Sequence, residues 1–301
     1  MNQKTKIAIL IPVYNRLEIT KIGIRNLEKS IKDKTFDSII LEVVVVDDNS
    51  PDKTYDWIKK NANWIHLLKG KGDLWWTGAI NLGAKYAINK LKCDYLLLWN
   101  DDVAADEFYF DHLSMFSVTN KFDVLGSLAL YNDNRNKVHS FGGFFNEKNG
   151  KKGVFYINKN KNEIKENVKK VDWLPGMGTL VSKNVIDKIG YWNEKDFPQY
   201  FGDSDFTLRA KKAGFGIYVS KELMIFNNIE TTGLNKRTDK FIDLYKSLKS
   251  IRSVYHLEKN LKFYKIHGKT IFSLYGLFLK YFGYIGGFFK WKLINIFNKN
   301  A

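Results

Sequence analysis

Four short and nearly continuous apolar segments occur in the first hundred residues, and this pattern restricts the fold more than any other feature of the chain. They cover residues 6–11, 41–46, 64–68 and 95–99, and helices are expected at 17–32 and 78–90. Apolar runs of this length, alternating with helices, are typical of parallel strands that helices cover on both faces. We therefore expect an α/β fold with a mostly parallel, Rossmann-like sheet.

Polar residues follow the end of each apolar segment. Right-handed crossovers bring the carboxyl ends of parallel strands to one edge of the sheet, where open α/β sheets bind ligands. We expect Asp48 to accept a hydrogen bond from a pyrimidine base and Asp47 to be structural, whereas Arg16 either contacts a phosphate or caps the next helix. The residues expected at a nucleotide are Pro12, Tyr14, Asn15, Arg16, Asp48, Trp76, Gly78, Asn81 and Asp101.

The fourth apolar segment ends in Asn100-Asp101-Asp102. Adjacent carboxylates repel each other and are costly to desolvate, so a pair at the end of a core strand suggests a bound cation that carries phosphates. We expect Asp102 to bind Mg²⁺ or Mn²⁺, which both prefer oxygen ligands. The alternative interpretation is a solvated turn.

A second acidic cluster lies in YFGDSDF, residues 200–206, before an expected helix. Asp203 and Asp205 are both candidates for a general base that takes a proton from an acceptor hydroxyl. The alternative interpretation is that one of them only caps the helix.

Charge and cysteine content limit the partners and the compartment. The 48 Lys and Arg residues exceed the 32 Asp and Glu residues, which gives a formal net charge of +16 and favours anionic partners. The basic residues are scattered and no nucleic-acid-binding motif is present, so no nucleic acid is expected. The single cysteine, Cys93, excludes an intramolecular disulfide and fits a cytoplasmic location as a buried, inert thiol. The first apolar run is too short for a secretory signal.

The chain divides into three expected regions, residues 1–105, 106–237 and 238–301. Residues 146–170 are rich in Lys and Asn and are expected to form a hairpin or a mobile loop that is too polar to pack. Residues 271–289 are almost entirely apolar and carry one charge, Lys280. We expect a helix that lies in an anionic membrane interface, rather than a packing helix or a true span, because lysines also flank the segment. These flanking residues are Lys262, Lys265, Lys269, Lys290 and Lys292.

Five motifs resemble, in their order, those of the family 2 glycosyltransferases of the GT-A fold, from Ile7 to about Ser220. They are PVYNR (12–16), VVVVDDNSPD (43–52), LLLWNDDV (96–103), GMGTLVSKNVIDKIGYWNE (176–194) and YFGDSDFTLRAKKAGF (200–215). The closest likeness is to the rhamnosyltransferase-like branch that builds bacterial surface polysaccharides. The resemblance implies a nucleotide-binding half and an acceptor-binding half, followed here by a membrane-associating helical extension.

The resemblance also implies an inverting transfer from a UDP- or dTDP-linked sugar to a hydroxyl of a glycan or polyprenyl-linked acceptor. Asp48 would bind the base, Asp102 the metal, and Asp203 would be the general base. The residues implied on the acceptor side are Trp173, Gly176, Met177 and Gly178. The Gln-x-x-Arg-Trp motif of processive synthases is missing, so one sugar per encounter is expected.

The chain departs from the family pattern at two places. Gly202-Asp203 replaces the usual Glu-Asp, which keeps Asp205 as a rival base, and Phe226-Asn227-Asn228 stands where many members have a metal-binding His. A degenerate family member that only binds glycan or membrane is therefore an alternative. A sugar-phosphate nucleotidyltransferase is a weaker one, because PVYNR is not the glycine-rich loop that such enzymes use.

Overall fold

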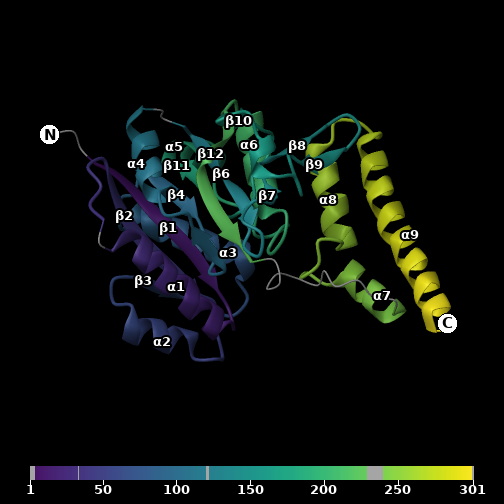
Figure 1. Cartoon of the computed structure of the whole chain (residues 1–301), viewed down its shortest axis with the longest axis horizontal. Helices are drawn as coiled ribbons and strands as arrows, with labels where there is room; N and C mark the ends of the chain where they lie inside the picture. The colour runs from purple at the N-terminus through teal and green to yellow at the C-terminus, as the bar shows by residue number, and fades with distance from the viewer. Residues whose placement is uncertain (1–3, 33, 120–121, 229–239, 300–301) are drawn as a thin grey trace.

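The expected apolar segments form the central strands of one large sheet (Figure 1). The computed structural model describes residues 4–32, 34–119, 122–228 and 240–299. The strands are β1 (Thr5–Val13), β2 (Ile39–Asp47), β3 (His66–Lys69), β4 (Tyr95–Leu98), β5 (Val103–Ala105), β6 (Val124–Tyr131), β7 (Val138–Ser140), β8 (Gly143–Phe145), β9 (Lys152–Val154), β10 (Val168–Lys170), β11 (Thr179–Ser182) and β12 (Ile217–Asn227). The helices are α1 (Leu17–Ile31), α2 (Thr54–Asn61), α3 (Trp75–Asn89), α4 (Tyr109–Thr119), α5 (Lys183–Ile189), α6 (Gly202–Lys212), α7 (Phe241–Lys249), α8 (Leu257–His267) and α9 (Ser273–Lys299), with a short 3₁₀ turn at Lys161–Glu163.

The sheet has the order β10-β12-β6-β11-β4-β1-β2-β3. Strands β3, β2, β1 and β4 are parallel to one another, and β12 is parallel to β6. Strand β11 is antiparallel to both of its neighbours, β4 and β6, and so joins the two parallel groups. The prediction of a mostly parallel α/β fold is therefore confirmed, and the sheet continues without a break past residue 105.

Both faces of the sheet are apolar because helices cover both. In β1, Ala8 and Leu10 pack into one core cluster with α3, α5 and α6, whereas Ile7 and Ile9 pack into the other with α1, α2 and α4. Since neighbouring residues of a strand point to opposite faces, a strand buried on both sides needs apolar residues at every position. Cys93 is buried in the first cluster, where burial raises the pKa of its thiol to about 12, so the prediction of a buried thiol is confirmed.

Residues 146–170 pack more closely than their composition suggests. The expected hairpin is present, because β9 pairs antiparallel with β8. The expectation that the stretch is too polar to pack is wrong, since Ile164 is buried in the core and β10 pairs with β12. A few apolar side chains are enough to anchor this segment.

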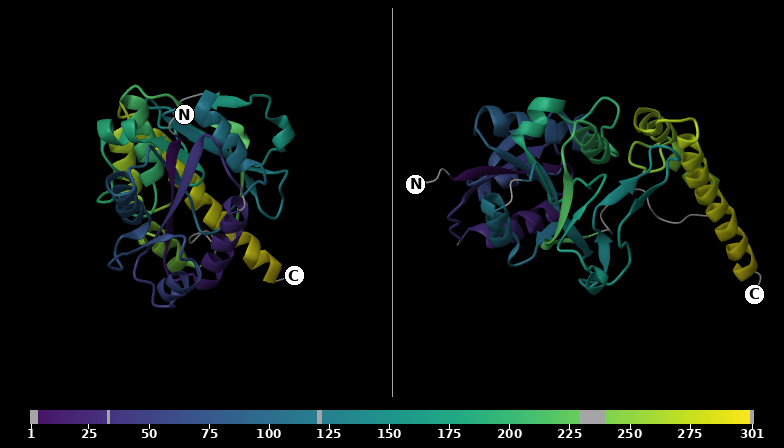
Figure 2. Two further views of the ribbon diagram at one scale, coloured as in Figure 1. Left: turned by 90° about the vertical axis from the view of Figure 1, so that its left-hand side faces the viewer. Right: turned by 90° about the horizontal axis from the view of Figure 1, so that it is seen from above.

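The C-terminal helices lie beside the sheet domain, with α9 as a long outer rod (Figure 2). Helices α8 and α9 pack on the domain through a third, aromatic-rich cluster, which includes Phe263 and Tyr281 from the helices and Phe145 and Phe197 from the domain. Within the described residues, no helix is both long and apolar enough to cross a bilayer. One face of α9 thus packs on the domain, which agrees with the alternative interpretation of the tail as a packing helix. The other face does not pack.

Candidate active site

The loops that follow β1 and β2 are tied together by hydrogen bonds. The backbone N–H of Asn15 donates to Ser50 Oγ (2.9 Å), and that of Leu17 donates to Asp52 Oδ2 (2.8 Å). Asn15 has a left-handed backbone, with φ of 51°, which turns the chain from β1 into α1. The ends of the two strands therefore form one surface, on which Tyr14 is exposed.

Asp48 holds the glycine-containing loop that precedes α3. Its carboxylate accepts hydrogen bonds from the backbone N–H groups of Gly72 (2.8 Å), Leu74 (2.8 Å) and Trp75 (3.2 Å). Asp47 is more deeply buried, and burial raises the pKa of its carboxyl. Asp47 Oδ1 accepts from Ser50 N (2.7 Å), whereas Oδ2 makes no hydrogen bond with the described residues. The carboxylate of Asp48 is therefore buried against the N–H groups of this loop.

Arg16 lies between the two carboxylates that follow β4. Its Nη2 is 2.9 Å from Asp101 Oδ1 and 2.7 Å from Asp102 Oδ2. Thr20 Oγ1 also donates to Asp101 Oδ2 (2.8 Å). Burial raises the pKa of Asp101 to about 6, although the Arg16 charge opposes this. Helix α1 approaches closely because Gly23 faces this turn, where an added Cβ would lie 2.0 Å from the Asp101 carbonyl oxygen.

The two carboxylates converge on one nitrogen of Arg16, so they lie close enough together to share a cation. No group of three or more His, Cys, Asp or Glu side chains suited to a metal occurs in the part of the chain that the structure describes. Asn227 nevertheless lies nearby, because it pairs with Val103, the residue after Asp102. Its amide Oδ1 is buried and forms no hydrogen bond to any described residue. The Asn that replaces the expected His therefore stands next to the acidic turn with an oxygen available.

Trp76 connects this turn to the acidic cluster at α6. Its indole N–H donates to Asn100 Oδ1 (3.1 Å). Its ring packs against Gly176 so closely that a Cβ there would lie 2.2 Å from the indole. The backbone N–H of Gly176 in turn donates to Asp203 Oδ2 (2.9 Å). Trp76 and Gly176 thus fix Asp203 relative to the end of β4.

Asn81, expected at the nucleotide, has a different environment. Its side-chain amide donates to Trp192 O (2.9 Å) and Glu194 Oε2 (2.7 Å), and its Oδ1 accepts from Trp192 N (3.0 Å). Asn81 thus joins α3 to residues 192–194, and its contact with a nucleotide stays a prediction. Gly78 lies one turn earlier on α3 and is buried as well, close to Leu74.

The structure separates the two candidate bases. Asp205 is completely buried, and its oxygens accept from Arg209 Nε (2.9 Å) and His267 Nε2 (2.9 Å). Burial lowers the pKa of His267, although the hydrogen bond to Asp205 and the charge of its carboxylate oppose this shift. Asp203, in contrast, lies in the wall of a cavity. Of the two candidates, Asp203 thus lines a cavity and Asp205 is buried.

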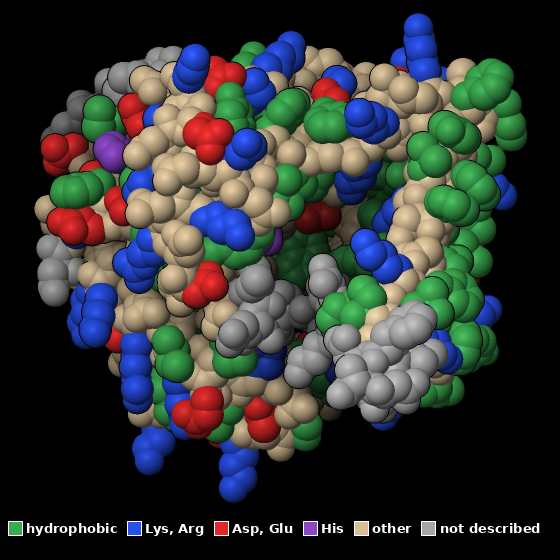
Figure 3. Space-filling view, turned by 45° about the vertical axis from the view of Figure 1, so that its right-hand side comes forward, with side chains coloured by type: hydrophobic (Ala, Val, Ile, Leu, Met, Phe, Trp, Pro, Cys, Tyr) green, Lys and Arg blue, Asp and Glu red, His purple; other side chains and the backbone are tan. Residues whose placement is uncertain are grey.

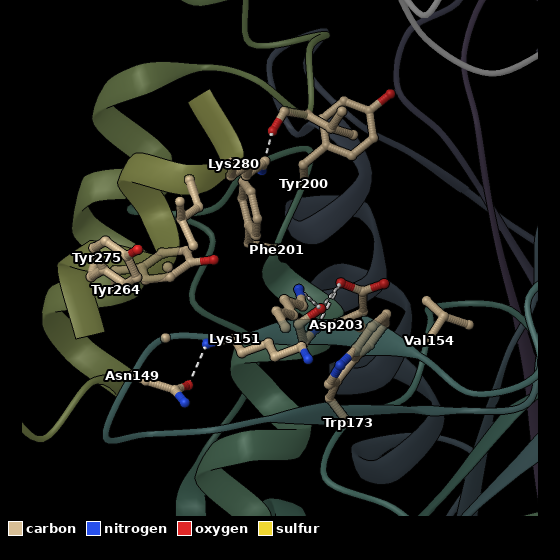
Figure 4. Close-up of a pocket in the computed structure, with 17 residues that line it drawn as sticks. Asn149, Lys151, Val154, Trp173, Tyr200, Phe201, Asp203, Tyr264, Tyr275 and Lys280 are labelled. Atoms are coloured by element: carbon tan, nitrogen blue, oxygen red, sulfur yellow. Dashed lines mark hydrogen bonds between the residues drawn. The ribbon is translucent and has the colours of Figure 1, made fainter. Parts of the chain in front are cut away.

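The cavity has a volume of about 830 Å³ and lies between the sheet domain and α9 (Figure 4). Phe201, Asp203 and Trp173 form part of its wall on the domain side, and Tyr264 and Tyr275 form part on the helical side. Among the expected acceptor residues, Trp173 lines the cavity and Gly176 binds Asp203.

Two of the expected acceptor residues do not line the cavity. Met177 is buried in the core cluster beneath α1 and α4. Gly178 has φ of 63° and donates its N–H to Leu98 O (2.8 Å) at the start of β11. Both residues thus have structural contacts, and their part in acceptor binding stays a prediction.

Lys152 and Lys280 also line the cavity, and neither was expected in the site. Lys152 lies in the polar stretch whose packing the sequence did not reveal. Lys280 carries the one charge in residues 271–289. A single lysine in an apolar segment can indicate a buried polar contact as well as a membrane interface, so the sequence did contain a signal for its position.

Comparison with known proteins assigns these features to a family. Residues 8–189 match the model of "Glycosyl transferase family 2". The chain is 24% identical over 182 residues to the "Low-salt glycan biosynthesis hexosyltransferase Agl10" of Haloferax volcanii, covering 59% of this chain and 56% of the relative. It is 22% identical over 241 residues to the "Probable glycosyltransferase YdaM" of Bacillus subtilis, covering 72% of this chain and 49% of the relative. The chain thus spans about half the length of these curated relatives.

Solved structures share the fold. Residues 1–349 of S. aureus TarS superpose with a TM-score of 0.52 at 20% identity, covering 74% of this chain and 60% of that one. The same TarS segment in complex with UDP-GlcNAc also matches, with a TM-score of 0.52 at 19% identity over 74% of this chain and 58% of that one. The predicted GT-A fold is confirmed by this likeness together with the family match.

Proposed function

The chain belongs to glycosyl transferase family 2, and on that basis we propose that it is an enzyme that transfers a sugar from a nucleoside diphosphate to an acceptor hydroxyl. The observation that carries this proposal is the series of contacts that leads from the acidic turn after β4, through Trp76 and Gly176, to Asp203. It joins a site suited to a diphosphate to a carboxylate in a cavity large enough for an acceptor.

The donor would occupy the edge of the sheet where β1, β2 and β4 end. Pro12, Tyr14 and Asn15 would support the nucleoside, and Arg16 would reach its phosphates. A carboxylate at the end of β2 would accept a hydrogen bond from a pyrimidine base. Asp48 could do so if its hydrogen bonds to the loop N–H groups were broken. Asp47 could do so through Oδ2, which has no partner among the described residues. We propose a UDP- or dTDP-linked sugar as the donor.

Members of this family commonly use a divalent metal, and the residues at the β4 turn fit one. Asp102 would hold the ion, with Asp101 beside it and Asn227 Oδ1 as a further oxygen. Mg²⁺ is usually held by one or two carboxylates together with substrate phosphates and water, so two carboxylates are sufficient. When bound, the ion would neutralise the charge of the departing diphosphate. Arg16, released from the carboxylates, would be available to the donor phosphates.

Asp203 would act as the general base of an inverting, non-processive transfer. Its Oδ2 accepts the Gly176 N–H, and its Oδ1 accepts the Ser204 N–H (2.7 Å), so the carboxylate is held in one orientation. It would take the proton of the acceptor hydroxyl as that oxygen attacks the anomeric carbon. In this scheme residues 1–105 bind the donor and residues 106–237 carry the base.

The third region, residues 238–301, would bring the enzyme to the inner face of a cell membrane. The outward face of α9 is a stripe of large apolar side chains, and Figure 3 shows hydrophobic side chains gathered along this part of the molecule. The stripe comprises Tyr275, Phe278, Leu279, Phe282, Phe289 and Leu293. Lys265 on α8 and Lys290 on α9 are exposed and suit anionic headgroups. Lys262 and Lys269 instead pair with Asp196 and Glu147 of the sheet domain. The acceptor would be a surface glycan or a polyprenyl-linked sugar.

Thermal unfolding with UDP, dTDP, GDP and CMP, each with and without Mn²⁺, tests the donor site. A nucleotide at 100 times its dissociation constant should add about 2.7 kcal/mol of stability. We expect stabilisation by UDP or dTDP that increases with Mn²⁺ and decreases in Asp102→Asn. An Asp106→Asn variant, altered in a carboxylate outside the turn, is the control. Absence of stabilisation by all four nucleotides would contradict the proposal and favour a family member that only binds glycan or membrane.

A further inference from the structure

The cavity beside Asp203 contains more positive than negative charge. Of the described residues that line it, three are lysines and one is a carboxylate: Lys151, Lys152, Lys280 and Asp203. Most of the remaining wall is aromatic or aliphatic. Burying ammonium groups among apolar side chains is costly unless an anion accompanies them.

Lys152 enters the cavity from β9. Its Nζ donates to Ser204 Oγ (3.0 Å) and lies over the rings of Trp173 (4.3 Å) and Phe263 (4.7 Å). Burial lowers the pKa of Lys152 to about 8, although the charge of Asp203 opposes the shift. The aromatic rings stabilise this cation but do not neutralise it.

Lys280 enters from the opposite side, on α9. Its Nζ donates to Asn260 Oδ1 (2.6 Å) and Val254 O (3.1 Å), both neutral acceptors. Burial, and then repulsion by Lys152, lowers the pKa of Lys280 to about 7. Both ammonium groups lie over the same ring, that of Phe201, at 5.3 and 5.4 Å. Lys280, the one charge of the apolar segment, therefore points into the cavity.

Neither lysine forms an ion pair with a carboxylate within the described part of the chain. Lys152 and Lys280 line one cavity, and the charge of Lys152 repels that of Lys280, so an anion with several oxygens in this cavity would stabilise both. A phosphate or diphosphate ester has the required charge and can accept hydrogen bonds from both ammonium groups at once.

The cavity is also continuous with the exposed apolar stripe of α9. Tyr275 and Leu279 line the cavity, yet they are 57% and 48% exposed and belong to the stripe. Figure 3 shows a hollow in the surface beside this hydrophobic strip. A ligand bound between the lysines could therefore extend a hydrocarbon chain along α9 without crossing a polar surface.

We propose that Lys152 and Lys280 bind the phosphate or diphosphate of a lipid-linked acceptor, whose sugar lies at Asp203 and whose hydrocarbon lies along α9. The inference rests on the proposed function, since it names the acceptor class of the same site. It gives α9 a second role, as one wall of the acceptor site.

Binding of farnesyl diphosphate to the full chain, measured by calorimetry, tests the inference. We expect Lys152→Met and Lys280→Met each to weaken binding by about tenfold or more, since each removes a charge-assisted hydrogen bond. Lys280→Arg should retain most of the affinity. Lys290→Met, which changes an exposed lysine on the same helix, is the matched control and should bind as the unaltered chain does.

Two comparisons make the outcome decisive. Arg16→Met should leave farnesyl diphosphate binding unchanged, because Arg16 belongs to the donor site; a loss in Arg16→Met but not in Lys280→Met would place the ligand there and overturn the inference. Inorganic diphosphate should bind more weakly than farnesyl diphosphate, and equal affinities would exclude the lipid. Absence of binding would also overturn it. Nucleotide stabilisation, measured on the same variants, reports separately on the proposed function.

Discussion

Charged side chains of the candidate site differ in the partners that they have. Arg16 sits between the carboxylates of Asp101 and Asp102 at the donor edge, and the buried Asp205 pairs with Arg209. Lys152 and Lys280 in the cavity have only neutral hydrogen-bond acceptors among the described residues. In the proposed scheme the turn after β4 would therefore hold a cation and the cavity an anion.

The lowered pKa of Lys280 predicts how stability changes with pH. Its pKa is about 7 in the folded chain, compared with 10.5 for a lysine exposed to water, so the unfolded chain binds more protons between these values. The free energy of unfolding should therefore rise with pH from about 7 toward 10, by roughly 1–3 kcal/mol for this group.

Urea unfolding of Lys280→Met at pH 7 and pH 9 measures this effect. The rise in unfolding free energy should be smaller in Lys280→Met than in the unaltered chain and unchanged in Lys290→Met. Equal pH dependence in all three proteins would mean that Lys280 is protonated normally. If Lys280 had a purely structural role, Lys280→Met would change the unfolding free energies at pH 7 and pH 9 by the same amount, and the difference between the two pH values would stay as in the unaltered chain.

Secondary-structure elements far apart in the sequence are joined at the acidic cluster. Helix α6 carries Asp203 on the cavity side and Asp205 on the opposite side, where His267 at the end of α8 donates to it. This contact fixes the helix that bears the proposed base against the C-terminal helices.

Removing this contact should loosen α6. His267→Phe would keep an aromatic side chain but remove the N–H that donates to a buried carboxylate. The free energy of unfolding should fall by about 1–3 kcal/mol. Urea unfolding should show this loss, and His112→Phe, which removes a more exposed hydrogen bond to Glu222 O, should change little. If His267→Phe were as stable as the unaltered chain, the contact between α6 and α8 would not be a stabilising one.

The sequence predicted the strands and the acidic turn because local patterns determine both. Apolar runs define β1, β2 and β4, and parallel topology brings their ends together. The partners of Asp48 could not be predicted in this way, because the loop that it holds is 24 to 27 residues away. The inward direction of Lys280 was also hidden, since α9 is apolar on both its packed and its exposed face. Only tertiary packing decides that Leu277 and Tyr281 are buried while Phe278 and Phe282 are exposed.

The whole molecule combines a sheet domain with an outer helical wall (Figure 2). The cavity that contains Asp203 is lined by residues of both. In the proposed membrane attachment, the exposed stripe of α9 would be the surface that faces the lipid. An enzyme held in this way would meet a lipid-linked acceptor at the mouth of its own cavity.

Membrane attachment through α9 can be measured by sedimentation with anionic vesicles. Phe278→Glu and Phe282→Glu place charges in the apolar stripe and should release most of the protein, because insertion depends on buried apolar area and on attraction to anionic lipid. Ile22→Glu is the matched control, because Ile22 on α1 of the sheet domain is as exposed as Phe278, each at 60%. Equal sedimentation of all variants would exclude α9 as the attachment surface.

The central claim, that Asp203 serves as the base of a glycosyl transfer, is tested most directly by sugar transfer in Asp203→Asn. With labelled UDP- or dTDP-sugar and lipid-linked acceptor, turnover should fall by a factor of about 10²–10⁴, while nucleotide stabilisation stays unchanged. Asp187→Asn, an exposed carboxylate on α5, should transfer normally. Full transfer by Asp203→Asn would contradict the account and require the proton to be taken by another group.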